Sequence, residues 1–403
     1  MAQHGHRQGV PAEAAAETEA LMAAFADSPG AVAPSRQLYR VAIIGGGPAG
    51  CACALALAQH GVHDVLVIEA GDYAQFRIGE SIPPEANRLF QALDIAQEFF
   101  AEAHAPCHGS CSWWGSAKRG YNDALLHPLG HGWHLERSRF NGFLARQARL
   151  RGAEVLLRAS LAASAPAQGG GFALELMLGD PAHPRLASIH ADLVVDASGT
   201  RAVFARQRGS RKVETLPLVC LAMRFAAPDG SRSGLTHLEA VEHGWWYGAH
   251  LPDATLLLAF YSDAATVKAR RLQLAGHWLA WLAAAPNTAA LARGAVPLAG
   301  GVQSFPAPSY CLDQLHGDGW LAIGDAASAY DPVTSQGIVK ALANGMAAAG
   351  AIAGHATLGA VAHTVAQRHA QYLAQRQQYY GWEQRWPAAP FWRRLHAGAQ
   401  VAA

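Results

Sequence analysis

The chain has 403 residues, of which 51% are hydrophobic and only 15% are charged. This composition supports a large core in one interlocked fold or two domains, and it excludes disorder along most of the length. With a formal charge of +1 and no basic or acidic block, the sequence gives no indication of nucleic-acid binding.

The N-terminal segment and the cysteines bear on the cellular compartment. Residues 1–37 are rich in Ala, Gly and Pro and lack the apolar core of a signal peptide, and Glu13, Glu17 and Glu19 are wrong for a transit peptide. The six cysteines show no disulfide-framework rhythm, and no stretch approaches a transmembrane span. We therefore expect a reduced, cytoplasmic protein without membrane contact, with a flexible arm over residues 1–37.

The pattern of apolar residues predicts an α/β fold. A buried strand at 39–46, a helix at 48–61 and a second strand at 64–71 form a parallel β-α-β unit. The elements predicted after it, in chain order, are helices at 84–101 and 135–151, a strand at 186–199, antiparallel strands within 215–262, a helix at 264–285, a strand at 319–327, a helix at 335–354 and a helical tail at 360–396.

The turn between the first strand and the first helix fits the pattern GxGxxG through Gly45, Gly47 and Gly50. Gly45 allows the tight turn, Gly47 lets the backbone approach a pyrophosphate, and Gly50 lets the helix pack closely on the strand. The helix N-terminus then offers free N–H groups to the phosphates. Glu69 ends the next strand, 24 residues after Gly45, where a carboxylate suits ribose hydroxyls. This context predicts a dinucleotide site.

Two later segments end strands in polar turns. VVDASG ends in Asp196 and Gly199, which in isolation is an ordinary turn. GWLAIGDAASAYDPVTSQG carries Gly324 and Asp325 at a strand end and opens a helix near Gly337. A carboxylate there can hold ribityl or ribose hydroxyls, and the helix start can bind an anion.

In this order the three motifs resemble those of flavoprotein monooxygenases of the para-hydroxybenzoate hydroxylase type, a superfamily that includes flavin-dependent halogenases. The resemblance runs from about residue 38 to the C-terminus. It implies a Rossmann-type, glutathione-reductase-like FAD-binding domain interleaved with an antiparallel-sheet substrate domain, and a helical C-terminus. The FAD-binding segments are expected at 38–110, 135–210 and 306–355, the substrate-domain segments at 111–134 and 211–305, and the helical tail at 356–403.

Together, the motifs and the resemblance predict which residues bind the cofactor. These are Gly45, Gly47, Pro48, Ala49, Gly50, Glu69, Arg77, Arg137, Asp196, Gly199, Gly324, Asp325, Pro332, Ser335, Gln336, Gly337 and Ile338. Only one dinucleotide fingerprint is present, so NADH or NADPH is expected as a transient reductant, or a flavin reductase as a partner. O2 is the expected co-substrate.

The segments RIGESIPP, GHGWHLERSRF, GWWYGAHLP and RWPAAPFW narrow the resemblance. They are similar to flavoproteins that mature cysteine-tryptophylquinone enzymes, such as lysine and glycine oxidases and quinohemoprotein amine dehydrogenase. This implies hydroxylation of a tryptophan in a partner protein through a flavin C4a-hydroperoxide. Two alternatives stay open: a halogenase or hydroxylase of a small aromatic metabolite, and a flavoprotein assembly factor of low turnover.

Two departures from the halogenase pattern favour hydroxylation. Halogenases carry a lysine that captures hypohalous acid, expected just before the strand that contains Ser110 to Gly115, and the stretch APCHGSCSWWG has none. The halogenase WxWxIP pattern is also broken in WWYGAH, where Tyr247, Ala249 and His250 replace Trp, Ile and Pro.

Glu80 and His250 are the candidate catalytic residues, and His134 is a weaker one. The spacing of His104, Cys107, His108 and Cys111 matches no zinc pattern, so no metal site is expected. The tail aromatics Trp382, Trp386, Phe391 and Trp392 stand at near-helical spacing and are expected to pack against the FAD domain.

Overall fold

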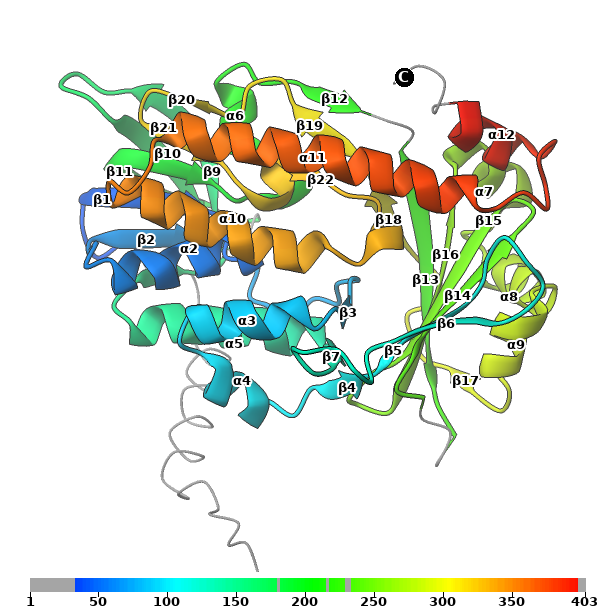
Figure 1. Cartoon of the computed structure of the whole chain (residues 1–403). Helices are drawn as coiled ribbons and strands as arrows, with labels where there is room; N and C mark the ends of the chain where they lie inside the picture. The colour runs from blue at the N-terminus through cyan, green and yellow to red at the C-terminus, as the bar shows by residue number, and fades with distance from the viewer. Residues whose placement is uncertain (1–32, 180–181, 215–216, 229–232, 398–403) are drawn as a thin grey trace, which may run out of the picture.

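The computed structural model describes residues 33–179, 182–214, 217–228 and 233–397. Apart from residues 33–37, the arm predicted at 1–37 lies outside the described part of the chain. The described residues form two large β-sheets, which lie at opposite ends of the molecule in Figure 1, with a long C-terminal helix running across both.

The first sheet carries the predicted β-α-β unit. Its eight strands follow the order β20-β21-β11-β1-β2-β8, with β10 paired to β11 and β9 to β10. Strand β1 runs parallel to both β2 and β11, so the chain reverses its direction of winding beside β1. The bounds are β1 Leu38–Ile44, β2 Val65–Ile68, β8 Glu154–Leu156, β9 Ala159–Pro166, β10 Phe172–Leu178, β11 Arg185–Asp196, β20 His316–Gly317 and β21 Trp320–Ala322.

Helices cover this sheet, and small residues let two of them approach closely. Helix α10 packs on α2, and a Cβ at Gly345 would lie 2.4 Å from the carbonyl oxygen of Ala49. Ala and Gly at this contact therefore set the distance between the two helices. The helices of this part are α2 Pro48–Gln59, α3 Glu85–Ala92, α4 Ala96–Ala101, α5 Arg137–Leu150, α6 Val203–Gln207, α10 Gly337–Ile352 and α11 Leu358–Gly381.

The second sheet is built mainly from the segment predicted to hold antiparallel strands. The strand order is β17-β13-β16-β15-β14-β5-β6, with β18 paired to β13. The four strands β13, β14, β15 and β16 pair antiparallel, as predicted. Strand β5 comes from far earlier in the chain and lies parallel to β14. The bounds are β5 Gly109–Trp113, β6 Gly120–Asp123, β13 Leu218–Ala226, β14 Thr236–Val241, β15 Gly244–His250, β16 Thr255–Ser262, β17 Val296–Pro297 and β18 Gln303–Ala307.

Both faces of the second sheet are covered, which explains its almost fully buried strands β15 and β16. On one face Trp246 packs with Trp278 of helix α8. The helices on this face are α7 Ala264–Arg270, α8 Ala275–Ala283 and α9 Pro286–Leu291. On the other face Trp245 packs with Phe391 and Trp392, and helix α12 Pro390–Ala397 carries both. The expectation that the tail aromatics pack against the FAD domain is therefore wrong for these two residues.

Two predicted helices are each split in two by a residue in the left-handed region. Asp94 at φ 54° separates α3 from α4, and Arg271 at φ 51° separates α7 from α8. Apolar periodicity continues through both breaks, so it did not reveal them. The tail is helical as predicted but is interrupted between α11 and α12.

Short three-stranded sheets join the two halves. One has the order β3-β7-β4, with β3 Ser81–Ile82, β7 Gly132–His134 and β4 Ala105–Cys107, and it brings three distant segments together beside the second sheet. The other has the order β12-β19-β22, with β12 Lys212–Glu214, β19 Tyr310–Leu312 and β22 Ser328–Ala329.

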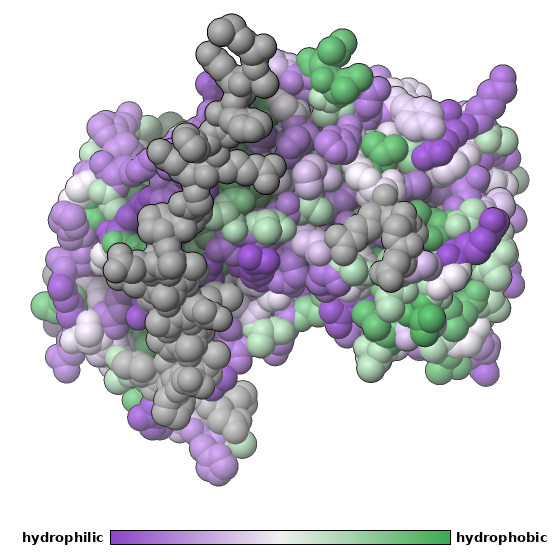
Figure 2. All heavy atoms as spheres, turned by 90° about the horizontal axis from the view of Figure 1, so that it is seen from below, coloured by the Kyte–Doolittle hydropathy of each residue, from purple (hydrophilic) through white to green (hydrophobic). Residues whose placement is uncertain are grey.

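The surface is mixed in polarity. Figure 2 shows apolar residues gathered mainly on the side of the molecule that carries α8 and α9. No helix among the described residues is long and apolar enough to cross a membrane.

Candidate functional site

The glycine turn at the end of β1 has the geometry of a phosphate cradle. Gly45 has φ +113°, and a Cβ there would lie 2.3 Å from the carbonyl oxygen of Ala197. A Cβ at Gly50 would lie 2.0 Å from the carbonyl oxygen of Gly45. At Gly47, by contrast, a Cβ would meet no atom within 4 Å. Packing therefore requires glycine at positions 45 and 50, whereas Gly47 leaves open space at the start of α2.

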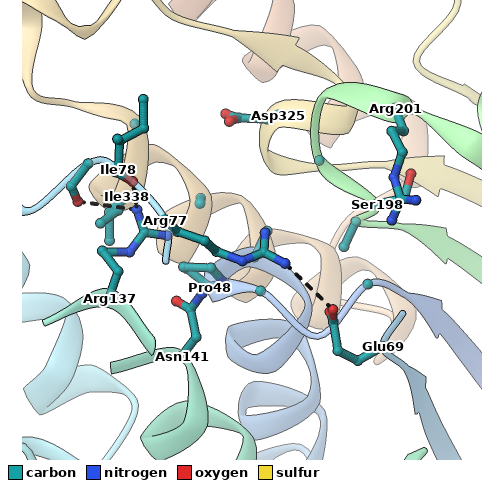
Figure 3. Close-up of a pocket in the computed structure, with 18 of the residues that line it drawn as sticks. Pro48, Glu69, Arg77, Ile78, Arg137, Asn141, Ser198, Arg201, Asp325 and Ile338 are labelled. Atoms are coloured by element: carbon teal, nitrogen blue, oxygen red, sulfur yellow. Dashed lines mark hydrogen bonds and ion pairs between the residues drawn. The ribbon is translucent and has the colours of Figure 1, made fainter. Parts of the chain in front are cut away.

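That open space belongs to a cavity of about 450 Å³ at the carboxyl ends of β1 and β11. Fourteen of the predicted residues line it: Gly45, Gly47, Pro48, Ala49, Glu69, Arg77, Glu80, Arg137, Gly199, Asp325, Pro332, Ser335, Gly337 and Ile338. Figure 3 shows that the labelled residues of this lining come from separate loops and helices around one hollow. A cavity that includes a helix N-terminus and a glycine backbone without a side chain fits a dinucleotide.

Glu69 is held rigidly at one end of this cavity. Its Oε2 accepts a hydrogen bond of 2.8 Å from the Gly46 N–H, and its Oε1 accepts one of 2.8 Å from the Gly71 N–H. The Arg77 guanidinium lies 3.8 Å from Oε1. The carboxylate is thus oriented by backbone groups, and its remaining acceptor positions suit ribose hydroxyls.

Arg137 stands at the other side of the cavity, at the start of α5. Its Nη1 donates hydrogen bonds to the carbonyl oxygens of Ile78 (2.5 Å) and Gly79 (3.2 Å). Figure 3 shows this side chain directed toward the loop of Ile78. Among the described residues, its buried Nε has no hydrogen-bond partner. Arg137 therefore fixes the loop before β3 and keeps one N–H for a ligand.

Three predicted cofactor residues lie behind the cavity wall, as Gly50 does. The buried Asp196 accepts hydrogen bonds from the N–H groups of Ser198 (3.0 Å) and Ala205 (2.8 Å), and burial raises its pKa. A Cβ at Gly324 would lie 2.7 Å from that of Ala49. Gln336 donates a hydrogen bond of 3.2 Å to Gln375 on α11. In this structure these side chains shape the turns, and none of the three lines the cavity.

The sequence did not predict a role at the site for several residues that complete the cavity wall, namely Asn141, Ser198, Arg201, Tyr247, Tyr261 and Asp331. Asp331 holds the loop that faces the cavity: it accepts hydrogen bonds from Arg376 Nε (3.0 Å) and the Tyr380 hydroxyl (2.7 Å) on α11. Only the DP step marked this position in the sequence, and it gave no sign of the distant partners.

Glu80 is buried at the cavity, and its Oε1 has no hydrogen-bond partner among the described residues. Burial is the main reason that the pKa of this carboxyl is raised to about 7, although nearby Arg137 acts in the opposite direction. Glu80 therefore titrates near neutral pH, in the range suited to proton transfer.

Replacing Glu80 should change how stability depends on pH. Between about pH 4.5 and 7 the unfolded chain ionises this carboxyl while the folded chain keeps it protonated, so wild-type stability falls as pH rises. The loss is on the order of 3 kcal/mol above pH 7. Glu80→Gln should remove this loss of stability. The melting temperature of the variant minus that of wild type should therefore be larger at pH 8 than at pH 5. Glu85→Gln, at an exposed site, is the control. A difference between Glu80→Gln and wild type that is equal at both pH values would contradict the assignment.

His250, the second catalytic candidate, does not line the cavity. It is buried at the end of β15, and its Nδ1 accepts a hydrogen bond of 3.4 Å from the Ser233 N–H. The prediction that His250 lies near the substrate therefore finds no contact in this structure. His134 is also buried, and its Nε2 lies 3.1 Å from the hydroxyl oxygen of Thr236.

A second, more open hollow of about 680 Å³ lies between the small sheet β3-β7-β4 and the second large sheet. We call it the groove. Its wall includes Cys107, Gly109 and Ser110 of the β4–β5 segment, and also Trp114, Tyr379 and Trp382. Ser81 and Ser335 line both the cavity and the groove, so the two spaces adjoin at these two residues.

The positions of the lysines bear on the chemistry at this junction. The chain has four lysines, Lys118, Lys212, Lys268 and Lys340, and all lie in the described residues. None is among the residues that line the cavity or the groove. Lys340 is buried beside the cavity, but its ammonium donates a hydrogen bond of 2.7 Å to Asp325 and another to the carbonyl oxygen of Ser328.

The fold and the site combine a cavity that fits a dinucleotide with a more open groove beside it. The model of the family described as tryptophan halogenase matches residues 40–131 and 116–352. The chain therefore belongs to the tryptophan halogenase family.

Individual relatives agree with this membership. LodB of Marinomonas mediterranea, named as an FAD-dependent oxidoreductase, is 28% identical over 363 residues, which cover 89% of this chain and 97% of LodB. A 1H-pyrrole-2-carbonyl-[peptidyl-carrier protein] brominase of Pseudoalteromonas luteoviolacea is 29% identical over 78% of this chain and 77% of its own. The halogenase armH4 of Armillaria mellea is 27% identical over 78% of this chain and 64% of its own length.

Solved structures share the fold. The myxobacterial chondrochloren halogenase CndH superposes with a TM-score of 0.80 at 22% identity, covering 91% of this chain and 89% of CndH. QhpG, described as a peptidyl tryptophan dihydroxylase essential for tryptophylquinone cofactor biogenesis, superposes with a TM-score of 0.70 at 23% identity, covering 89% of this chain and 78% of QhpG. At these identities the likeness establishes the fold alone.

Proposed function

We propose that the chain is an FAD-dependent monooxygenase that hydroxylates an aromatic ring. The observation that carries this proposal is the junction of cavity and groove, which is lined by Ser81 and Ser335 and by no lysine of the described chain. An oxidant produced at the cofactor would therefore reach a ring in the groove directly. Proximity and exclusion of water supply much of the catalysis in such a transfer.

The residues of the cavity match the parts of FAD. Gly47 and the N-terminus of α2 would hold the pyrophosphate, Glu69 the ribose, and Asp325 hydroxyls of the ribityl chain. Pro332 and the N-terminus of α10 would face the flavin ring. FAD supplies the activation of O2 when it is bound. NADH, NADPH or a partner reductase would reduce it.

Halogenation is the second candidate, and the comparisons favour it over hydroxylation. The family model is that of tryptophan halogenases, and the brominase and armH4 are both halogenating enzymes by name. The argument against it is local: the β4–β5 segment, where halogenases carry their lysine, lines the groove with Cys107, Gly109 and Ser110. Without an amine there, hypohalous acid has no carrier into the groove.

We further propose that the substrate is a tryptophan side chain of a partner protein in quinone-cofactor biogenesis. The groove is open, its volume exceeds that of the cavity, and aromatic side chains stand at its rim. Trp382 is 56% exposed there although tryptophan is usually more buried. Exposed tryptophans often anchor protein partners. QhpG, which shares this fold over 89% of the chain, is described as a peptidyl tryptophan dihydroxylase, so the fold is compatible with such a substrate.

Trp382→Ala tests the substrate class. With a tryptophan-bearing polypeptide as substrate, the variant should show a KM about 10-fold higher, as expected for loss of an interface anchor, while FAD content stays unchanged. Oxidation of NADH or NADPH in the presence of polypeptide or free tryptophan measures this. Leu186→Ala, which removes an exposed side chain on β11, is the control. Stimulation by free tryptophan alone would contradict a protein substrate. No stimulation by either would favour the assembly factor.

A further inference from the structure

Three hydroxyls and one imidazole form a continuous line between the cavity and the protein interior. The Tyr247 hydroxyl lies 2.7 Å from Ser81 Oγ, which lies 2.7 Å from Thr236 Oγ1, which lies 3.1 Å from His134 Nε2. These residues come from the neighbouring strands β14 and β15 and from β3 and β7, which lie much earlier in the chain. Tyr247 lines the cavity, Ser81 lines both spaces, and Thr236 lines the groove.

The surroundings of His134 keep its ring neutral at neutral pH, so one ring nitrogen carries no proton. Burial lowers its pKa to about 4, and the neighbouring His250, His237 and His108 act in the same direction, whereas the backbone of His250 favours the protonated ring. At the other end of the line, burial and the nearby Glu80 and Cys107 raise the pKa of Tyr247. Cys107 Sγ also lies 3.7 Å from Thr236 Oγ1. Between the two ends stand only the hydroxyls of Ser81 and Thr236, each able to donate and accept at once.

We propose that Ser81, Thr236 and His134 form a proton-transfer chain that removes the ring proton during hydroxylation of a substrate in the groove. This inference rests on the proposed function. The O–O bond of O2 breaks, so that one oxygen atom forms a C–O bond with the ring as a hydroxyl and the other leaves as water. Reduced nicotinamide supplies a hydride and solvent supplies one proton, and the proton released by the ring completes the balance. The ring C–H bond breaks and its electron pair returns to the ring. The proton passes to Ser81 Oγ while Ser81 gives its own proton to Thr236 and Thr236 gives its proton to His134 Nε2.

The two substitutions Thr236→Val and Thr236→Ser separate this role from packing. Val keeps the shape of the side chain and removes the hydroxyl, whereas Ser keeps the hydroxyl. We expect Thr236→Val to lower kcat by about 100-fold with little change in KM, since general-base transfer contributes about 100-fold or more. Thr236→Ser should restore most of the rate. FAD content and melting temperature, measured in parallel, report on folding.

A readout without turnover tests the connection itself. In holoprotein labelled with 15N-histidine, the His134 Nε2 resonance is assigned by its loss in His134→Gln. It should shift in Thr236→Val and return toward its original position in Thr236→Ser. The control is Ser262→Ala, which removes a buried hydroxyl that donates to the carbonyl oxygen of His243, outside the chain. It should leave both the resonance and kcat unchanged.

The outcomes distinguish this proposal from the function on which it rests. If wild-type enzyme adds no oxygen to any aromatic substrate, the proposed function fails and this role fails with it. If oxygen is added but Thr236→Val turns over as fast as Thr236→Ser, the proton-transfer chain alone is wrong. An unshifted His134 resonance in Thr236→Val would overturn it as well.

Discussion

Gly47→Leu should yield a folded protein that no longer retains FAD. The backbone at Gly47 has φ −76°, which any residue adopts, and a Cβ there would meet no atom within 4 Å. A leucine therefore adds no strain to the chain itself, but its side chain fills the space where the pyrophosphate would approach the backbone. We expect the affinity for FAD to fall by at least about 100-fold, which corresponds to about 2.7 kcal/mol.

The measurement is FAD content after purification, read from the visible spectrum, together with the melting temperature without cofactor. Gly276→Leu is the matched control, because a Cβ at Gly276, at the start of α8, also meets open space but lies outside the cavity. The control should retain FAD. If Gly47→Leu retained FAD at the wild-type level, the assignment of the glycine turn would be wrong.

The sequence predicted well where a single segment carries the information. The turn of Gly45, Gly47 and Gly50 lies within one β-α-β unit, and the spacing of the glycines was enough to predict it, although the close contact of Gly45 is with Ala197, which follows β11. The antiparallel strands of 215–262 are consecutive in the chain and could likewise be predicted from their alternation.

Where distant segments meet, the sequence was insufficient. Asp331 is held by Arg376 and Tyr380, about fifty residues later, and no local pattern marks that contact. Ser81, Thr236 and His134 meet only because β3, β14 and β7 come together in the folded chain. His250, at the end of β15, is not among the residues that line the cavity, and the motif on β15 alone did not indicate its contact with the Ser233 N–H.

The second large effect concerns the product. With chloride and bromide both present, we expect the enzyme to add oxygen and no halogen to its substrate. The reason is the junction at Ser81 and Ser335: none of the four lysines of the chain lines it, so hypohalous acid would find no amine to carry it to the ring. Oxygenation and halogenation change the mass of the substrate by different amounts, so the product mass distinguishes them without ambiguity.

The most direct test of the central claim is therefore the mass of a tryptophan-bearing protein partner produced together with this enzyme in the presence of both halides. The visible spectrum of bound FAD confirms that the enzyme is loaded, and the Gly47→Leu variant is the negative control. We expect a gain of one or two oxygen atoms on a tryptophan residue. Replacement of a ring hydrogen by chlorine or bromine would contradict it and establish halogenation as the function.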